Sequence, residues 1–300
     1  MKAALLKAYG GIDRFAIEDI PTPKPGAGEV LIKIAASAVN PFDLILRQGV
    51  MAQYISLPLP AVLGGDAAGT IAELGASVTG FAIGDRVVAD FPANGKGAHA
   101  EYGVVAATSV AKLPAALTFE QGASLVKAGL TGRQTVDALG VKAGDRVLVS
   151  GGLGAVGRAA IQYLKQIGAK PVAGVRPERL GEAREVAGDA LDITTAPSPA
   201  FDFAISAAAP VAANLIGHVR DGGQVASIVP VPEGANAGNR VVIHELYHRT
   251  DAATLDAVLD AAARGVLIIP IAETLALEQI GAAQNAVASG VQGKVVLRHG

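Results

Sequence analysis

The sequence predicts an α/β protein of two domains, a compact β-rich domain followed by a doubly wound parallel sheet. The first third of the chain reads as short strands separated by glycine and aspartate, with no long helix between them. After Thr118 strands and helices alternate, which is typical of parallel strands joined by right-handed crossovers. With 300 residues, the chain also reaches the length, about 250–300 residues, at which a single hydrophobic core stops growing.

The composition supports a large core and excludes several functions. Hydrophobic residues make up 51% of the chain, charged residues 17%, and the formal net charge is -2. This balance gives no electrostatic reason to expect nucleic acid or an anionic membrane as a partner. Cysteine is absent, which rules out disulfides, a thiolate nucleophile and zinc sites with sulfur ligands. No apolar run is long enough to suggest a signal peptide or a membrane span, so we expect a cytoplasmic protein.

The first domain is expected over residues 1–117. A strand begins at Glu29 after the turn signal "PKPGAG", and the runs "AAGTIAELG", "GDRVVAD" and "AEYGVVAATSVAKL" predict three more β-rich segments. Thr118 and Gln121 form a capping-box pattern that predicts a helix start. The second domain is expected over 118–266, and 267–300 should return to the first domain through the closing strand "GKVVLRHG".

The second domain is predicted from its alternating pattern. The expected strands are Arg146–Ser150, Pro171–Val175, Phe201–Ile205 and Gln224–Val229, and the expected helices are Gly154–Ile167 and Glu178–Val186. Near its end, "NRVVIHELY" alternates apolar and polar residues and reads as an edge strand.

A glycine motif joins the first of these strands to its helix. Within "SGGLGAVG", the pattern G-x-G-x-x-G falls on Gly152, Gly154 and Gly157. We expect Gly152 to permit the tight turn, Gly154 to leave room for a pyrophosphate, and Gly157 to let the helix pack on the sheet. The backbone N–H groups of Ala155 and Val156 would then face the phosphates at the helix N-terminus. The motif predicts a dinucleotide site; the alternative is a glycine-rich turn without a ligand.

The end of the second strand of this domain indicates which dinucleotide binds. NAD-binding sheets usually carry an acidic residue there, but "AGVRPERL" places Arg176 and Arg179 at that point. Guanidinium groups suit a 2′-phosphate, so we expect NADPH. Two solvated surface arginines are the alternative reading, and Glu178 could favour NADH.

By these motifs the chain resembles the medium-chain dehydrogenase/reductase superfamily, in its zinc-free quinone oxidoreductase (zeta-crystallin-like) branch. The resemblance rests on "AVNPFD", "LGGDAAGTIAELGASVTGFAIGDRVVA", "GAHAEYGVV", "KAGLTG", "GDRVLVSGGLGAVGRAAIQYLKQIGAK" and "GKVVLR", in that order. It implies a GroES-like catalytic domain and a Rossmann cofactor domain. It also implies a homodimer in which edge strands pair across a two-fold axis.

The resemblance also bears on metal binding. Where zinc-dependent relatives place a ligand Cys and a ligand His, this chain has Asn40 and Gly65, and Asp66 stands in place of their Glu. The lobe of four cysteines that holds a structural zinc is missing as well. We therefore expect no metal site.

The zinc-free relatives imply further site residues. Asn40 would bond the nicotinamide carboxamide or the substrate carbonyl, and Asp43 would brace the loop; an Asx-turn role after Pro41 is the alternative for Asp43. Thr131 matches a threonine near the nicotinamide ribose, although it could be an ordinary helix residue. Lys294 matches a lysine near the cofactor, with a solvated strand-end lysine as the alternative.

One tyrosine of the family pattern is displaced. The family often has a tyrosine two residues after the glycine of "RQG", whereas this chain has Met51 there and Tyr54 three positions later. Tyr54 is therefore a candidate catalytic residue whose reach to the site is open. The five histidines show no metal-ligand spacing and are expected to be structural or on the surface.

The expected function is an NADPH-dependent, zinc-independent reductase that transfers hydride to a quinone or to an α,β-unsaturated carbonyl such as an enone or enal. Such chemistry needs position and a dry site more than a strong acid. One alternative is an enoyl-thioester reductase; another is a non-enzymatic, zeta-crystallin-like protein that binds NADPH or RNA. The acidic balance and the aromatic content of 4% argue against RNA.

Overall fold

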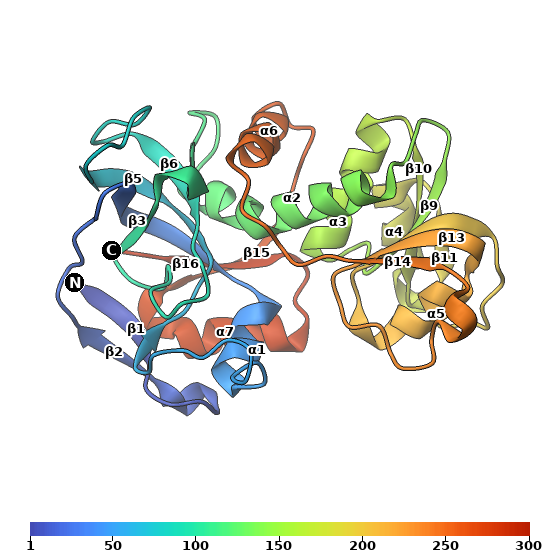
Figure 1. The fold of residues 1–300 in the computed structure, drawn as a ribbon, viewed down its shortest axis with the longest axis horizontal. Coiled ribbons are helices and arrows are strands. Elements are labelled where there is room, and N and C mark those ends of the chain that lie inside the picture. The colour runs from blue at the N-terminus through green and yellow to red at the C-terminus, as the bar shows by residue number, and fades with distance from the viewer. The chain divides into compact units, whose positions relative to one another are not determined.

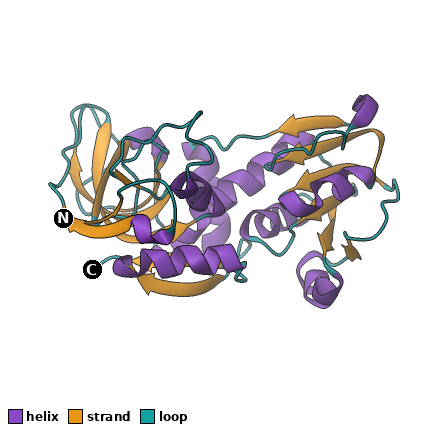
Figure 2. Cartoon of the chain, turned by 90° about the horizontal axis from the view of Figure 1, so that it is seen from below, coloured by secondary structure: helices purple, strands orange, loops and turns teal.

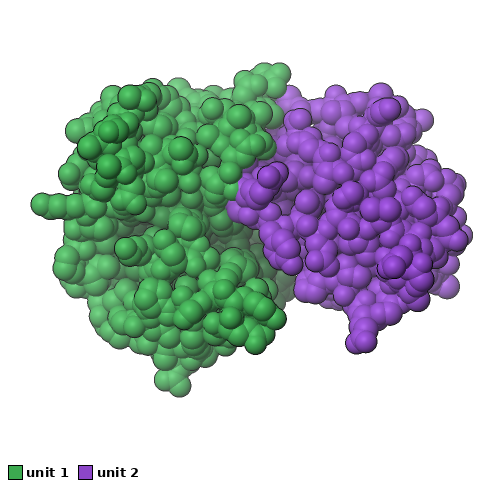
Figure 3. Space-filling view, viewed as in Figure 1, with its two compact units in different colours: residues 1–127, 250–265, 269–300 green, residues 128–249, 266–268 purple.

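The computed structural model describes all 300 residues, and it confirms the predicted fold class (Figure 1). The chain divides into two compact units (Figure 3). Unit 1 contains Met1–Lys127, Thr250–Gly265 and Ile269–Gly300, and unit 2 contains Ala128–Arg249 and Val266–Ile268. The chain passes from unit 1 to unit 2 after Lys127 and returns to unit 1 after Arg249, rather than at residues 117 and 266. The first of these points lies within helix α2 (Phe119–Leu139).

Unit 1 is built on two sheets. The smaller sheet has the order β2-β1-β4, and the larger has the order β15-β16-β3-β5-β6-β8, with β7 also paired to β3. The strands are β1 (Lys2–Leu6), β2 (Phe15–Asp19), β3 (Glu29–Val39), β4 (Ala61–Val62), β5 (Asp66–Leu74), β6 (Arg86–Asp90), β7 (Tyr102–Ala106), β8 (Val110–Lys112), β15 (Ile271–Ala276) and β16 (Lys294–Arg298). The last strand, β16, pairs antiparallel with β3, which brings the end of the chain beside its first third.

Three helices belong to unit 1: α1 (Pro41–Gln48), α6 (Ala252–Ala263) and α7 (Ile280–Ser289). The sequence pattern did not predict α1. It begins directly after β3, with Pro41 in its first turn and Asn40 as the preceding cap. The Asp43 carboxylate accepts a hydrogen bond from the backbone N–H of Asn40 at 2.7 Å. This local bond fixes the side chain of Asp43 at the start of the helix.

Unit 2 contains a six-stranded, all-parallel sheet in the order β11-β10-β9-β12-β13-β14. Its strands are β9 (Arg146–Ser150), β10 (Lys170–Val175), β11 (Ala190–Asp192), β12 (Phe201–Ser206), β13 (Val219–Ser227) and β14 (Val242–Glu245). Counted from β9, this is the doubly wound order 3-2-1-4-5-6, which reverses direction between β9 and β12. Ligands of such sheets bind beyond the carboxyl ends of the strands at this reversal.

Three helices lie between strands of unit 2 along the chain; Figure 2 draws helices in purple and strands in orange. They are α3 (Ala155–Gln166), α4 (Leu180–Ala187) and α5 (Ala212–Gly217). The capping box predicted at the start of α2 is confirmed: Thr118 N–H donates to Gln121 Oε1 at 2.8 Å, and Gln121 N–H donates to Thr118 Oγ1 at 3.2 Å.

Two predicted boundaries were wrong. Helix α4 begins later than expected, because Pro177–Arg179 forms a separate 3-10 turn. Strand β13 begins at Val219 rather than Gln224, because it continues through the exposed residues Arg220, Asp221 and Gly222, where its register against β12 shifts.

The edge strand of unit 2 and the lengths of the helices bear on the expected dimer and on membrane insertion. Strand β14 lies at the edge of its sheet, where we expected an edge strand, and Val242 at its start is 51% exposed. Pairing of two copies across this edge stays a prediction. No helix is both long and apolar enough to cross a bilayer.

Candidate active site and cofactor site

The glycine-rich turn after β9 joins the strand to helix α3 as predicted, but its glycines do not all have the roles expected of them. Gly151 has φ +62, so the tight turn is made by Gly151 and not by Gly152 as expected. Gly152 is needed for packing, because a Cβ there would lie 2.9 Å from both Ala173 Cβ and Ile161 Cδ1. At Gly157 a Cβ would overlap the Gly151 carbonyl oxygen, so helix α3 can pack on the turn only without a side chain.

The third glycine, Gly154, is placed to leave space. It caps the N-terminus of α3, and a Cβ on it would meet only the Gly151 carbonyl oxygen, at 3.2 Å. No side chain caps this helix end, and the first N–H groups of any α-helix, here those of Ala155 and Val156, have no partner within the helix. The turn therefore offers free donors, a positive dipole end and room, which fit a dinucleotide pyrophosphate.

The two arginines expected at the 2′-phosphate differ in their surroundings. Arg176 directly follows β10, is exposed, and its guanidinium makes no hydrogen bond or ion pair. Arg179 is already engaged: it forms a salt bridge to Glu182 at 2.5 Å, and Arg158 contacts the same carboxylate at 3.1 Å. Arg176 is therefore the better candidate for an incoming phosphate.

Thr131 also has a partner in unit 2. Its side chain is mostly buried, and its hydroxyl lies 3.2 Å from the Nδ1 atom of His248. This contact links the segment after β14 to helix α2. His248 therefore has a structural role that the sequence analysis did not predict.

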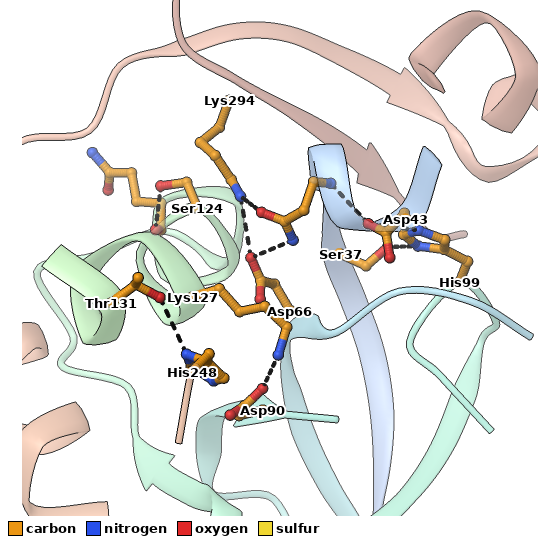
Figure 4. Close-up of polar contacts among 12 residues, drawn as sticks. Ser37, Asp43, Asp66, Asp90, His99, Ser124, Lys127, Thr131, His248 and Lys294 are labelled. Carbon is orange, nitrogen blue, oxygen red and sulfur yellow. Dashed lines mark hydrogen bonds and ion pairs between the residues drawn. The ribbon is translucent and has the colours of Figure 1, made fainter. Parts of the chain in front are cut away.

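Unit 1 holds a buried polar cluster at the ends of β3, β5 and β16 (Figure 4). The Lys294 ammonium donates to Asn40 Oδ1 at 2.6 Å and to Asp66 Oδ2 at 3.1 Å. Asn40 Nδ2 donates to the same Asp66 oxygen at 3.0 Å. Asn40 and Lys294, named separately from the sequence, thus lie together, and Lys294 is buried rather than solvated.

A second lysine enters the cluster from α2. The Lys127 ammonium forms a close ion pair with Asp90 Oδ1, and the Thr250 hydroxyl donates to Asp90 Oδ2 at 2.5 Å. The pKa of Lys127 is raised above its usual value: burial lowers it, but the nearby carboxylates of Asp90 and Asp66 outweigh that effect. A Cβ on Gly65 would overlap Lys127 Cε, so this side chain occupies the space beside Gly65.

Asp43 faces a row of buried polar side chains. Its Oδ2 atom lies 4.0 Å from His99 Nε2, and His99 Nδ1 is 3.0 Å from Ser37 Oγ. The same hydroxyl is 2.9 Å from His299 Nε2. Burial raises the pKa of Asp43 to about 6. Burial lowers the pKa of His99 to about 3 and that of His299 to about 4, so both imidazoles are neutral at pH 7.

A small pocket in unit 1 opens beside these groups. Its cavity volume is about 30 Å³, and its walls are mostly apolar, with Asp43 and Lys127 as the two ionisable side chains. The remaining lining residues are Phe42, Leu46, Leu57, Val62, Leu63, Gly64, Gly65, Phe91, Pro92, Ala93, Gly95 and Gly97. A cavity of this volume has room for about one water molecule, far less than the roughly 300–1,000 Å³ of a small-molecule site, so these side chains line only a small opening.

Tyr54 lies outside this arrangement. It follows α1, its side chain is 75% exposed, and it lines neither the pocket nor the polar cluster. Sequence reasoning also missed several members of the cluster: Ser37, Asp90, His99, Lys127, Thr250 and His299. A charged residue within an otherwise apolar segment, as in "SLVKAGL", was the available signal for Lys127.

Comparisons with known proteins agree with this fold. Residues 26–115 match the alcohol dehydrogenase GroES-like domain. The quinone oxidoreductase of Homo sapiens is 38% identical over 173 residues, which cover 57% of this chain and 51% of that protein. A trans-enoyl reductase of Aspergillus terreus is 35% identical over 207 residues, covering 63% of this chain and 67% of that protein. The solved structure of the quinone oxidoreductase from Coxiella burnetii superposes with a TM-score of 0.89 at 26% identity, covering 99% of both chains.

The chain belongs to the medium-chain dehydrogenase/reductase superfamily, in its quinone oxidoreductase-like branch. Proteins of this family are oxidoreductases that depend on a nicotinamide dinucleotide. The matched stretch spans about half the length of the quinone oxidoreductases compared with it.

Proposed function

We propose that this chain is an NADPH-dependent, zinc-independent reductase that transfers hydride to a quinone or to an α,β-unsaturated carbonyl. The observation that carries the proposal is the turn after β9, where free N–H groups and open space at Gly154 meet at the reversal of a doubly wound sheet. The quinone oxidoreductases among the relatives support the substrate class.

The choice of NADPH rests on the end of β10. No carboxylate side chain precedes Arg176 in this strand, and its guanidinium is not committed to another partner. A 2′-phosphate carries about two negative charges, which an uncommitted arginine binds through charge-assisted hydrogen bonds. Glu178, which would oppose the phosphate, is exposed to solvent in the 3-10 turn.

Independence from zinc rests on what stands at the three positions named from the resemblance. The amide of Asn40 is a poor zinc ligand, the space beside Gly65 contains Lys127, and Asp66 accepts hydrogen bonds from Lys294 and Asn40. A zinc ion would face two ammonium groups in this cluster, and that repulsion opposes its binding.

Different residues of the chain would bind the cofactor, exclude water and hold charge near the substrate. The bound nicotinamide would supply the hydride. The N–H groups of Ala155 and Val156 would hold the pyrophosphate, and Arg176 would hold the 2′-phosphate. In unit 1, the apolar pocket walls would exclude water from the substrate, while the Lys127 ammonium, held by Asp90, would place positive charge at the pocket. Asn40 retains one amide hydrogen for a carbonyl oxygen, since its other amide hydrogen is bonded to Asp66.

An enoyl-thioester reductase is the second candidate, favoured by the match to a trans-enoyl reductase. A single screen separates the two candidates. NADPH oxidation is followed against quinones, enals and enoyl thioesters of matched acyl length. The first proposal predicts kcat/KM at least tenfold higher for a quinone or enal than for any thioester. The reverse order would support the thioester reductase, and no turnover with any member of the panel would contradict both.

A further inference from the structure

The buried cluster of unit 1 carries more negative than positive charge. Its carboxylates are Asp43, Asp66 and Asp90, and its ammonium groups are Lys127 and Lys294. Each lysine forms an ion pair with one carboxylate: Lys127 with Asp90, and Lys294 with Asp66. No lysine or arginine forms an ion pair with Asp43. A buried carboxylate without a paired cation tends to hold a proton, so Asp43 is the acid of this cluster.

The position of Asp43 suits proton donation to a ligand. Its side chain lines the pocket and is only 3% exposed overall. Oδ2 is occupied by the hydrogen bond from Asn40 N–H, whereas no hydrogen bond involves Oδ1. The carboxyl group thus keeps one oxygen free for a further hydrogen bond. A pKa raised by burial to about 6 lets it donate a proton near neutral pH.

A chain of buried groups lies behind Asp43. The His99 ring packs on the pocket wall, where a Cβ on Gly64 would lie 2.6 Å from its Nδ1. Ser37 Oγ then joins His99 Nδ1 to His299 Nε2 at 3.0 and 2.9 Å. The two outer nitrogens, His99 Nε2 and His299 Nδ1, are buried and have no hydrogen-bond partner. Neutral imidazoles carry one N–H and one acceptor nitrogen, so each ring can take up a proton on one side and release one on the other.

We propose that Asp43 is the proton donor of the pocket and that His99, Ser37 and His299 form the relay that restores its proton. The inference rests on the proposed function, because it supplies the proton that the reduced substrate needs. It names a proton source inside the protein.

The proton balance is simple. Hydride addition, with the nicotinamide cofactor oxidised and the substrate reduced by two electrons, leaves an enolate or a quinol anion. The Asp43 O–H bond breaks, and its proton bonds to that anion. The Asp43 carboxylate then takes the proton of His99 Nε2, His99 Nδ1 takes the Ser37 hydroxyl proton, and Ser37 takes the proton of His299 Nε2. Water supplies a proton to His299 Nδ1, which balances the charge. Both imidazoles then carry their proton on the opposite nitrogen, so each must return to its first tautomer before the next turnover.

The charged and titratable groups around the relay are few. Asp43 is faced by Asp66, Lys127 and Lys294 as well as by His99. His99 is faced by His299, and His299 is faced by Glu278. The pH dependence of the relay should therefore follow Asp43 within this set.

The first test uses the protein alone. Infrared difference spectra across pH 5 to 7, roughly the range of the raised carboxyl pKa, should show the C=O stretch of a buried carboxylic acid that disappears as the pH rises. Asp43→Asn should remove this band, and His218→Gln, which changes a buried histidine outside the relay, should leave it in place. A band that persists in Asp43→Asn would overturn the assignment of the acid, whatever the enzyme reduces.

The second test uses turnover with the best substrate of the panel. Asp43→Asn should lower kcat about 100-fold or more, in line with the loss of a general acid. His99→Gln should lower kcat and change its solvent deuterium isotope effect, while the rate of NADPH oxidation in a single turnover stays near that of the parent protein. Ser37→Ala removes one oxygen and gives the same test if His99→Gln does not fold. If both relay variants behave like His218→Gln, the relay is refuted; if the parent protein oxidises no NADPH, the proposed function fails instead.

Discussion

The side chain of Lys127 fills the space that any side chain at Gly65 would need, because a Cβ on Gly65 would overlap Lys127 Cε. The glycine and the lysine therefore depend on each other. The ammonium reaches Asp90 only because position 65 is bare, and the ion pair places a fixed positive charge beside the pocket.

This pairing leads to a prediction on metal content. Protein purified without chelators should contain far less than one zinc per chain, and activity should survive treatment with a chelator. No group of three or more histidine, aspartate or glutamate side chains is arranged to hold a metal ion, and two ammonium groups repel one. Elemental analysis of the dialysed protein checks this, and tightly bound stoichiometric zinc would contradict it.

Glycine substitutions should separate cofactor binding from folding. Gly154→Val should abolish dinucleotide binding and leave the fold intact, because only the Gly151 carbonyl oxygen lies near its Cβ position. Gly157→Ala is the matched contrast: its Cβ would overlap that oxygen, so it should lower the free energy of unfolding by about 1–3 kcal/mol. Calorimetric titration with NADPH and urea unfolding measure the two effects. Unchanged affinity in Gly154→Val would show that the phosphate site lies elsewhere.

The two arginines near β10 should differ in their effect on cofactor choice. Charge-assisted hydrogen bonds contribute about 1.5–3 kcal/mol each, so Arg176→Ala should weaken NADPH binding about tenfold or more and leave NADH nearly unchanged. Arg179→Ala should have a smaller effect, since Arg179 is held by Glu182. Dissociation constants for both cofactors decide the matter. Equal losses of NADPH and NADH affinity in Arg176→Ala would show that it does not contact the phosphate.

Stability should depend on pH through the buried histidines and Asp43. The pKa of His99 falls from 6.5 to about 3 and that of His299 to about 4, so their stabilising contribution, present above pH 6.5, is lost as the pH falls. Asp43 has the opposite sign: its pKa rises from 3.8 to about 6, and its contribution is lost as the pH rises through that range. Near pH 5 the unfolded chain should therefore bind about one more proton than the native chain, through these groups.

The variants test the sign of each contribution. One proton corresponds to a slope of about 1.4 kcal/mol per pH unit, with stability rising as the pH rises. His99→Gln should remove about this slope, whereas Asp43→Asn should increase it by a similar amount. Urea unfolding between pH 4.5 and 5.5, roughly midway between the shifted values, measures the difference. Identical slopes in the parent protein and His99→Gln would mean that His99 is not buried as a neutral group.

The parts of the protein that the sequence predicted are those encoded locally. The strand, turn and helix from Arg146 to Gln166 follow from one apolar run, a group of glycines and one helical periodicity. The motif could not tell which glycine takes the positive φ, since Gly151 stands next to Gly152 and either could make the turn. For the same reason, the 3-10 turn before α4 was not separated from the helix that follows it.

The polar cluster of unit 1 could be predicted only in part. The resemblance named Asn40, Asp43 and Lys294, but no local pattern links Ser37 to His299, which are 262 positions apart. Their contact depends on the antiparallel pairing of β3 with β16, a long-range feature. Tyr54 shows the opposite case, because its place in the sequence suggested a role that its exposed side chain does not support.

The central claim is that hydride passes from NADPH to the electrophilic carbon of a quinone or an unsaturated carbonyl. The most direct measurement is single-turnover reduction of an enal with NADPH that is deuterated at its transferable hydrogen. We expect one deuterium on the β-carbon of the product, a proton from solvent on the α-carbon, and full activity after chelator treatment. Deuterium on the carbonyl carbon, or its appearance in water instead of product, would contradict hydride transfer to the β-carbon.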